Sequence, residues 1–244
     1  MDGLSGKTFA FAFDRREGVQ LRAASRAPTR PSVAQPATSY DAALTIERAY
    51  DNLQRIQAML AYLHIVKQQV HGIGQFLDET KRTYQQALGR HEARDFEGAR
   101  EFASASGYLA SVVETIIARA LRSDSTYPSI VPPPPQHIAA AMDSAELEAE
   151  LDEVCAVLSR IHWLLEHGTL PIEERTQVRR IGSWSDALFA QARQLHASGS
   201  QEDAAEFLEA AQAAASAAEH VCRRWYAGHL PLADEAASLE VRQA

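Results

Sequence analysis

Residues 46–60 read IERAYDNLQRIQAML, and residues 151–165 read LDEVCAVLSRIHWLL. In both stretches apolar side chains recur at alternating spacings of three and four, which places them on one face of an α-helix. The positions are Ile46, Ala49, Leu53, Ile56 and Leu60, continuing to Leu63 and Val70, and Leu151, Val154, Leu158, Ile161 and Leu165. Each stretch therefore predicts a long helix whose apolar seam packs against other helices in the manner of a coiled coil.

The two seams lie 105 residues apart, and the same offset brings further residues into register. Unrelated helices would match at only a small fraction of positions, so the pattern indicates an internal duplication. The matched residues include Gln86, Ala87, His91, Glu97, Glu101, Phe102, Glu114 and Arg119, which align with Gln191, Ala192, His196, Glu202, Glu206, Phe207, Glu219 and Arg224.

Two more helices are predicted after each seam. The second helices fall near 75–92 and 172–198, and the third near 95–122 and 200–227. Asp95 and Ser200 are candidate N-caps of the third helices, because their side-chain oxygens can accept from free backbone N–H groups. The chain is thus predicted to be all-α, with two duplicated three-helix, up-down segments at 40–122 and 144–230 that form one helical bundle or two.

Three further regions lack this helical pattern. Residues 1–39 form a basic arm, and from residue 24 onward this arm contains several prolines and no apolar periodicity. Within it, Phe9, Phe11 and Phe13 alternate with other residues, which is compatible with a small β-hairpin at 8–22 or with a disordered tail. Residues 123–143 form a linker whose Pro132 to Pro135 favour polyproline II, as a spacer or as a ligand for an aromatic groove. Residues 231–244 read as an acidic tail.

Charge and composition exclude several classes of protein. The chain of 244 residues has a net charge of −8, divided into +3 for residues 1–40 and −11 for the rest. An acidic body is a poor nucleic-acid surface, so we expect no nucleic-acid partner.

No apolar run is long enough to cross a membrane, and the N-terminus lacks a signal-peptide pattern. Cys155 and Cys222 fall inside helical patterns, which predicts buried, reduced thiols and a cytoplasmic protein.

A duplicated set of carboxylates and imidazoles suggests a metal site at first sight. It consists of His91, Glu97, Glu101 and Glu114 and their matches His196, Glu202, Glu206 and Glu219. Helical geometry places Glu97 and Glu101 nearly opposite the apolar seam, which predicts a solvated face instead of ligands that converge. Glu-x-x-His, Gly-x-Ser-x-Gly and glycine-rich phosphate-loop motifs are missing from the sequence, so we expect no metal, no cofactor and no catalytic residues.

One short motif points to an enzyme. Arg224-Trp-Tyr-Ala-Gly-His229 resembles the Arg-x4–6-His motif of HEPN ribonucleases, and residues 195–221 resemble the helix-turn-helix of that all-α family. The resemblance implies that His229 acts as acid and base while Arg224 steadies the scissile phosphate. Gly228 and Pro231 end the helix before His229, which argues against a shared cleft.

Small residues on the last helix suggest a further packing partner. Its seam carries Ala204, Ala211, Ala214 and Ala218 where the first segment has Ala99, Ser106, Leu109 and Val113. Small side chains bury little area each, so this helix needs another helical surface, from the first segment or from another subunit. The sequence favours a non-enzymatic interaction or scaffold protein that forms a homo-oligomer with protein partners. The alternative is a HEPN-like ribonuclease or another nucleotide-processing enzyme.

Overall fold

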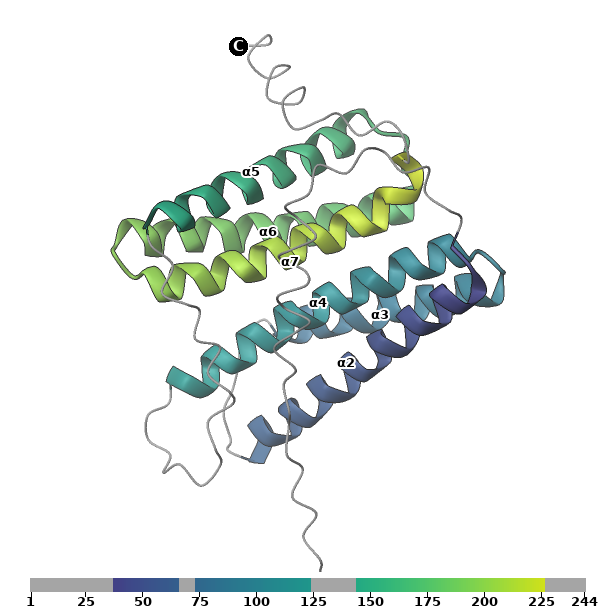
Figure 1. Cartoon of the computed structure of the whole chain (residues 1–244), viewed down its shortest axis with the longest axis horizontal. Coiled ribbons are helices and arrows are strands. Elements are labelled where there is room, and N and C mark those ends of the chain that lie inside the picture. The colour runs from purple at the N-terminus through teal and green to yellow at the C-terminus, as the bar shows by residue number, and fades with distance from the viewer. Residues whose placement is uncertain (1–36, 66–72, 124–143, 227–244) are drawn as a thin grey trace, which may run out of the picture.

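The computed structural model describes residues 37–65, 73–123 and 144–226, and the regular structure within these ranges is entirely helical, as predicted. Figure 1 shows the helices, which are α2 (Ser39–Ile65), α3 (Ile73–Glu92), α4 (Phe96–Ser123), α5 (Ser144–His167), α6 (Ile172–Ala197) and α7 (Gln201–Tyr226). Apart from residues 37–39 and Ser123, the predicted arm with its hairpin, the linker and the tail lie outside the described residues.

A reciprocal cap starts α2. Thr38 Oγ1 accepts a hydrogen bond from the backbone N–H of Asp41 at 3.2 Å, and Asp41 Oδ2 accepts one from the backbone N–H of Thr38 at 3.0 Å. This capping box satisfies two backbone donors that the first turn of a helix leaves free. It also lowers the pKa of the Asp41 carboxyl, mainly through the hydrogen bonds from Thr38.

The turns before α4 and α7 have the same geometry. Arg94 and Gly199, which are 105 residues apart, both adopt positive φ, at 61° and 83°. The next backbone N–H donates back across the turn, from Asp95 to the Arg90 carbonyl at 2.9 Å and from Ser200 to the Leu195 carbonyl at 3.0 Å. Both turns are therefore Schellman motifs. Asp95 then caps α4 as predicted, because its Oδ1 accepts from the backbone N–H of Gly98 at 3.1 Å.

Each half of the described chain is a three-helix unit, and the third helices join the two units. The helices α2 and α3 pack on α4, α5 and α6 pack on α7, and α4 packs on α7 at the centre of the molecule (Figure 1). Glu101 in the second turn of α4 contacts His220 near the end of α7, whereas Arg119 near the end of α4 contacts Asp203 near the start of α7. The two helices therefore run antiparallel.

The main core runs through both halves, and a smaller cluster of Ile56, Ala110, Val113 and Ile117 lies in the first half. Most predicted seam residues are buried, including Ile161 in the main core, while Leu60, Leu151 and Leu165 are partly buried. The alanines of α7 are covered within this chain, because α4, α5 and α6 all pack on α7. The first segment thus supplies the extra surface that the small side chains of α7 require.

Of the two cysteines, Cys222 is buried and its thiol pKa is raised to about 12, mainly by burial. Cys155 was predicted to be buried but is exposed. It follows Val154 in the sequence, so its side chain points away from the seam that Val154 joins. Both thiols are free in the structure.

Candidate functional site

A buried carboxylate at the α4·α7 contact collects three basic side chains. Only 3% of the Glu101 side chain is exposed, and its Oε2 lies 2.7 Å from Nδ1 of His220. Arg100 donates to Oε1 of Glu101 at 2.8 Å, and a guanidinium nitrogen of Arg223 lies 3.7 Å from Oε2. The ring of Tyr108 stacks on the imidazole with their centroids 5.3 Å apart. We call these five residues the junction cluster.

The junction cluster keeps its carboxylate ionised. Burial alone would raise the pKa of Glu101, but the hydrogen bond and charge of His220, with Arg100 and Arg223, hold it below its ordinary value. Because the carboxylate holds Nδ1, the orientation of the imidazole is fixed and Nε2 is the nitrogen that points away from Glu101. Burial also raises the pKa of the Tyr108 phenol. Chemically, the cluster is a salt link between the two halves that contains one oriented imidazole.

At the other end of the α4·α7 contact the charges are reversed. Nη1 of Arg119 on α4 lies 2.5 Å from Oδ1 of Asp203 and 3.4 Å from Oε2 of Glu206, both on α7. Its guanidinium also lies over the ring of Phe207, at 4.8 Å from the centroid. Glu206 is the counterpart of Glu101 at the 105-residue offset, so each half contributes one buried carboxylate to the junction.

The predicted solvated face is therefore wrong for two of the six glutamates. Glu97 and Glu202 are exposed as predicted, whereas Glu101 and Glu206 are buried. The physical reason is that α4 and α7 contact one another through a second face beside the seam: Glu101 and Glu206 directly precede Phe102 and Phe207, so each lies about 100° around its helix from that residue. Glu114 instead pairs with Arg55 at 2.7 Å, and its counterpart Glu219 pairs with Arg160 at 2.8 Å.

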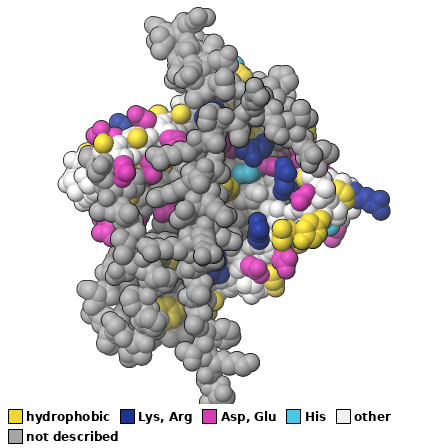
Figure 2. Space-filling view, viewed as in Figure 1, with side chains coloured by type: hydrophobic (Ala, Val, Ile, Leu, Met, Phe, Trp, Pro, Cys, Tyr) yellow, Lys and Arg dark blue, Asp and Glu magenta, His cyan; other side chains and the backbone are white. Residues whose placement is uncertain are grey.

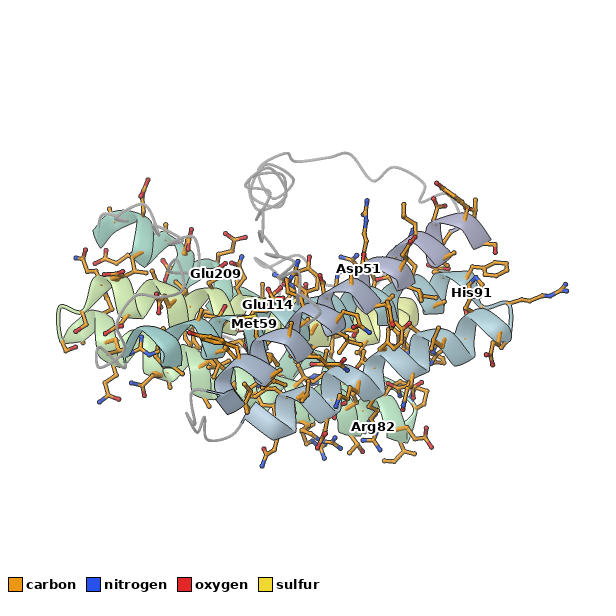
Figure 3. The ribbon with its side chains drawn as sticks, turned by 90° about the horizontal axis from the view of Figure 1, so that it is seen from below. Asp51, Met59, Arg82, His91, Glu114 and Glu209 are labelled. Atoms are coloured by element: carbon orange, nitrogen blue, oxygen red, sulfur yellow. The ribbon has the colours of Figure 1, made fainter. Side chains whose placement is uncertain are left out.

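These acidic and imidazole side chains do not converge. Figure 3 shows His91 at one end of the bundle and Glu114 near its middle. Within residues 37–65, 73–123 and 144–226, no group of three or more His, Cys, Asp or Glu side chains is placed to hold a metal ion. Of the motif shared with HEPN ribonucleases, Arg224 lies in the last turn of α7 and its side chain is not described, while His229 lies outside the described residues.

Polar side chains also bridge α3 and α6. Glu79 is buried, and its Oε2 accepts a hydrogen bond from Arg180 at 2.5 Å. The amide of Gln177, also buried, donates to Thr83 Oγ1 at 2.9 Å. Glu79 and Arg180 border a groove of about 400 Å³, which is lined by Gln75, Asp78, Glu79, Arg82, Arg180 and Trp184. Two acids and two arginines balance in this lining, so the groove offers no net charge to a ligand.

Several large apolar side chains are exposed on α2 and α3. Of the six large hydrophobic side chains that are exposed in the described part of the chain, four lie on these two helices: Tyr40, Leu44, Tyr50 and Leu88. Figure 2 shows an apolar patch right of the centre, with acidic and basic side chains beside it. At the 105-residue offset the corresponding residues are Ala145, Ala149, Cys155 and Arg193, which are small or charged. We call these four side chains, together with Tyr84, the outer face.

The sequence analysis missed the outer face, although the signal was present. A helix exposes some apolar residues at random, so Tyr50 or Leu88 alone predicts nothing. The positions matched at the 105-residue offset supply the contrast, because a residue that folding requires at both positions should be apolar at both. A large apolar side chain at only one of the two, such as Leu88 against Arg193, points to a surface with a separate role.

Neither a known protein family, nor a curated protein, nor a solved structure matches this chain. Its function is therefore inferred from its own side chains. The helices of the described ranges do not combine the length and the apolar character that crossing a membrane requires.

Proposed function

We propose that the chain is a non-enzymatic helical scaffold of the cytoplasm that works by binding protein partners and by associating with itself. The observation that carries this proposal is the outer face, where Tyr40 is 75% and Tyr50 48% exposed. Large apolar side chains that stay exposed on neighbouring helices are typical of protein–protein contacts. The free cysteines are compatible with a reducing compartment.

The same proposal includes the origin of the scaffold by duplication of one three-helix unit. Three helix boundaries recur at an offset of 105 residues and support this origin. They are the starts of α2 and α5 at 39 and 144, the ends of α3 and α6 at 92 and 197, and the starts of α4 and α7 at 96 and 201. The paired Arg55–Glu114 and Arg160–Glu219 contacts and the two Schellman turns lie at the same offset. Two units with the same backbone arrangement can differ in the side chains on their outer surfaces without losing the fold.

Sedimentation equilibrium of the purified chain tests the proposed self-association. We expect a dimer or higher form at tens of micromolar, with its mass falling on dilution. A single monomeric species across that range contradicts self-association, and the scaffold would then depend on other proteins alone.

The junction cluster is the one observation that favours the enzymatic alternative. A carboxylate that orients an imidazole is the arrangement of a general base, and here Glu101 orients His220. Tyr108 covers one face of that imidazole, and Glu101 already occupies Arg100 and Arg223, so the cluster offers a phosphate no uncommitted cation.

We therefore expect no cleavage of single-stranded RNA by the purified chain in the presence of a metal chelator. Cleavage that His229→Ala abolishes would establish the HEPN-like alternative, and cleavage that His220→Ala abolishes would assign the activity to the junction cluster. Circular dichroism of both variants checks that the fold is intact.

A further inference from the structure

The two three-helix units approach one another unequally on the two sides of their contact. On one side α4 packs on α7, with ion pairs at both ends of the contact. On the other side α3 and α6 face each other. Along 73–92 and 172–197, the described lengths of these two helices, no Cα atom of one comes within 8 Å of a Cα atom of the other. Helices that pack directly on one another bring some Cα atoms closer than this, so α3 and α6 are held apart and only their side chains touch.

Side chains bridge this gap at four successive steps along the two helices. The residue numbers rise on α3 as they fall on α6, so the helices run antiparallel, and three of the four steps are polar. The steps are Phe76 with Trp184, Glu79 with Arg180, Thr83 and Gln86 with Gln177, and Arg90 with Glu174. We call these residues the clasp.

The clasp contains two buried acceptors without a partner. Only 3% of the Glu79 side chain is exposed, and Arg180 binds its Oε2, but no donor among the described residues reaches its Oε1. The side-chain oxygen of the buried Gln177 also lacks a donor. A buried acceptor without a donor is less stable than the same acceptor in water, so hydration favours opening of the clasp.

The buried carboxylate on the other side of the contact does not have this weakness. Glu101 at the α4·α7 contact is also 3% exposed, but both of its oxygens are bound. Arg100 donates to Oε1, and His220 lies against Oε2. The α4·α7 side of the contact therefore gains nothing comparable from hydration.

The groove lies at the same step of the clasp as Glu79. It is bordered by Glu79 and Arg180, and the side chain of Arg180 is 38% exposed. Solvent thus reaches one partner of the buried ion pair without any movement of the helices. The weakest step of the clasp is also the step nearest to solvent.

We infer that the contact between the two units opens at the clasp while α4 stays packed on α7, so that the molecule has a closed and an open state. Opening moves α3 away from α6, hydrates Glu79 and Gln177, and exposes the paired rings of Phe76 and Trp184. The α4·α7 helices act as the hinge. This inference does not depend on self-association, and it gives the proposed scaffold an inner surface that only the open state presents.

Thiol labelling of single-cysteine variants tests the opening. The background is the full chain with Cys155→Ser and Cys222→Ala, which removes both native thiols. Thr83→Cys and Gln177→Cys then place one thiol inside the clasp, from α3 and from α6, at positions that are buried in the closed state. Each reporter leaves the partner side chain on the other helix in place.

The matched controls are Ser106→Cys and Ser185→Cys. Both serines are buried, and their hydroxyls donate within one unit, to the carbonyls of Thr80 and Ala211. With excess DTNB, a thiol reagent, we expect the clasp thiols to react about tenfold faster than the controls, at rates that low urea barely changes, because local opening exposes little surface. One common rate with the same steep urea dependence for all four thiols would mean that they react only after global unfolding, and would overturn the inference.

A pair of apolar substitutions separates natural opening from any disturbance by the reporter. Glu79→Met with Arg180→Met removes the unpartnered oxygen, and in the Gln177→Cys reporter it should slow labelling about three- to tenfold. The control, Arg55→Met with Glu114→Met, removes an ion pair inside one unit and should leave the labelling rate unchanged. Circular dichroism checks the helical content of every variant. A labelling rate that the Glu79 and Arg180 substitutions leave unchanged or raise would contradict the clasp as the site of opening.

Discussion

The two three-helix segments differ far more in their side chains than in their backbones. Both turn at a residue with positive φ, Arg94 in one and Gly199 in the other, and both link their first and third helices by an arginine–glutamate pair. At one position of the seam, however, Leu109 in the first segment stands where Ala214 stands in the second, and both are buried. The comparison indicates that turns and seams fix the backbone, while the remaining positions are free to specialise.

Exchanging side chains at this seam position should have the largest effect on the comparison. Leu109→Ala removes a fully buried side chain, and we expect it to lower the free energy of unfolding by about 2–5 kcal/mol. Ala214→Leu forces a larger side chain into the buried seam of α7 and should cost about 1–3 kcal/mol. Urea denaturation followed by circular dichroism measures both. An Ala214→Leu variant that is as stable as the wild type would show that the seam of the second segment has room for a leucine.

The two buried carboxylates of the junction should respond unequally. Glu101→Gln removes the charge that binds His220 and Arg100, and should lower the free energy of unfolding by about 1.5–3 kcal/mol at pH 7. Glu206→Gln should cost less, because Glu206 lies 3.4 Å from Arg119, which also binds Asp203. Equal losses in the same denaturation experiment would contradict this asymmetry.

The stability conferred by Glu101 should depend on pH in a defined direction. Its pKa in the folded chain lies below the ordinary value of 4.5, so the folded state favours the ionised form. This contribution is complete above pH 4.5 and disappears as the pH falls through the folded pKa. The difference in unfolding free energy between the wild type and Glu101→Gln should therefore shrink from pH 5 to pH 3. A difference that stays constant would contradict ionisation of Glu101.

The two turns allow a smaller and opposite pair of changes. Arg94→Gly should stabilise the chain by about 0.5–1 kcal/mol, because glycine adopts positive φ without a steric penalty. Gly199→Ala should destabilise it by about 1 kcal/mol. A Cβ at Gly199 would meet no heavy atom within 4 Å, so its cost is conformational. Thermal melting of both variants checks the opposite signs, and a loss in Arg94→Gly would mean that its side chain has contacts that outweigh the strain.

The smallest effect is expected at the repeated ion pairs. Arg55→Met and Arg160→Met each break a half-exposed contact with a glutamate and should cost about 0.2–1 kcal/mol. Similar values would support equivalent roles in the two segments. A cost several times larger for one of them, measured by urea denaturation, would show that the two pairs have diverged.

Local signals in the sequence predicted most of the backbone. Apolar periodicity located the six helices of the described ranges, and Asp95 marked the start of α4, because helix caps depend on neighbouring residues alone. The burial of Glu101 and Glu206 was not predicted, since it arises from a contact between helices that are distant in sequence. The same holds for Gln177 with Thr83 between α3 and α6. The outer face required a comparison of the two segments position by position.

The antiparallel α4·α7 contact has a consequence for the order of folding. Hydrogen bonds within a segment join residues 26 or 59 positions apart, whereas those across the junction join residues 84 to 119 positions apart. Closing longer loops costs more chain entropy before any contact compensates for it. Each segment should therefore form its own core first, and docking of α4 on α7 should follow as a separate, slower kinetic phase. Substitutions in the junction cluster should slow this second phase further.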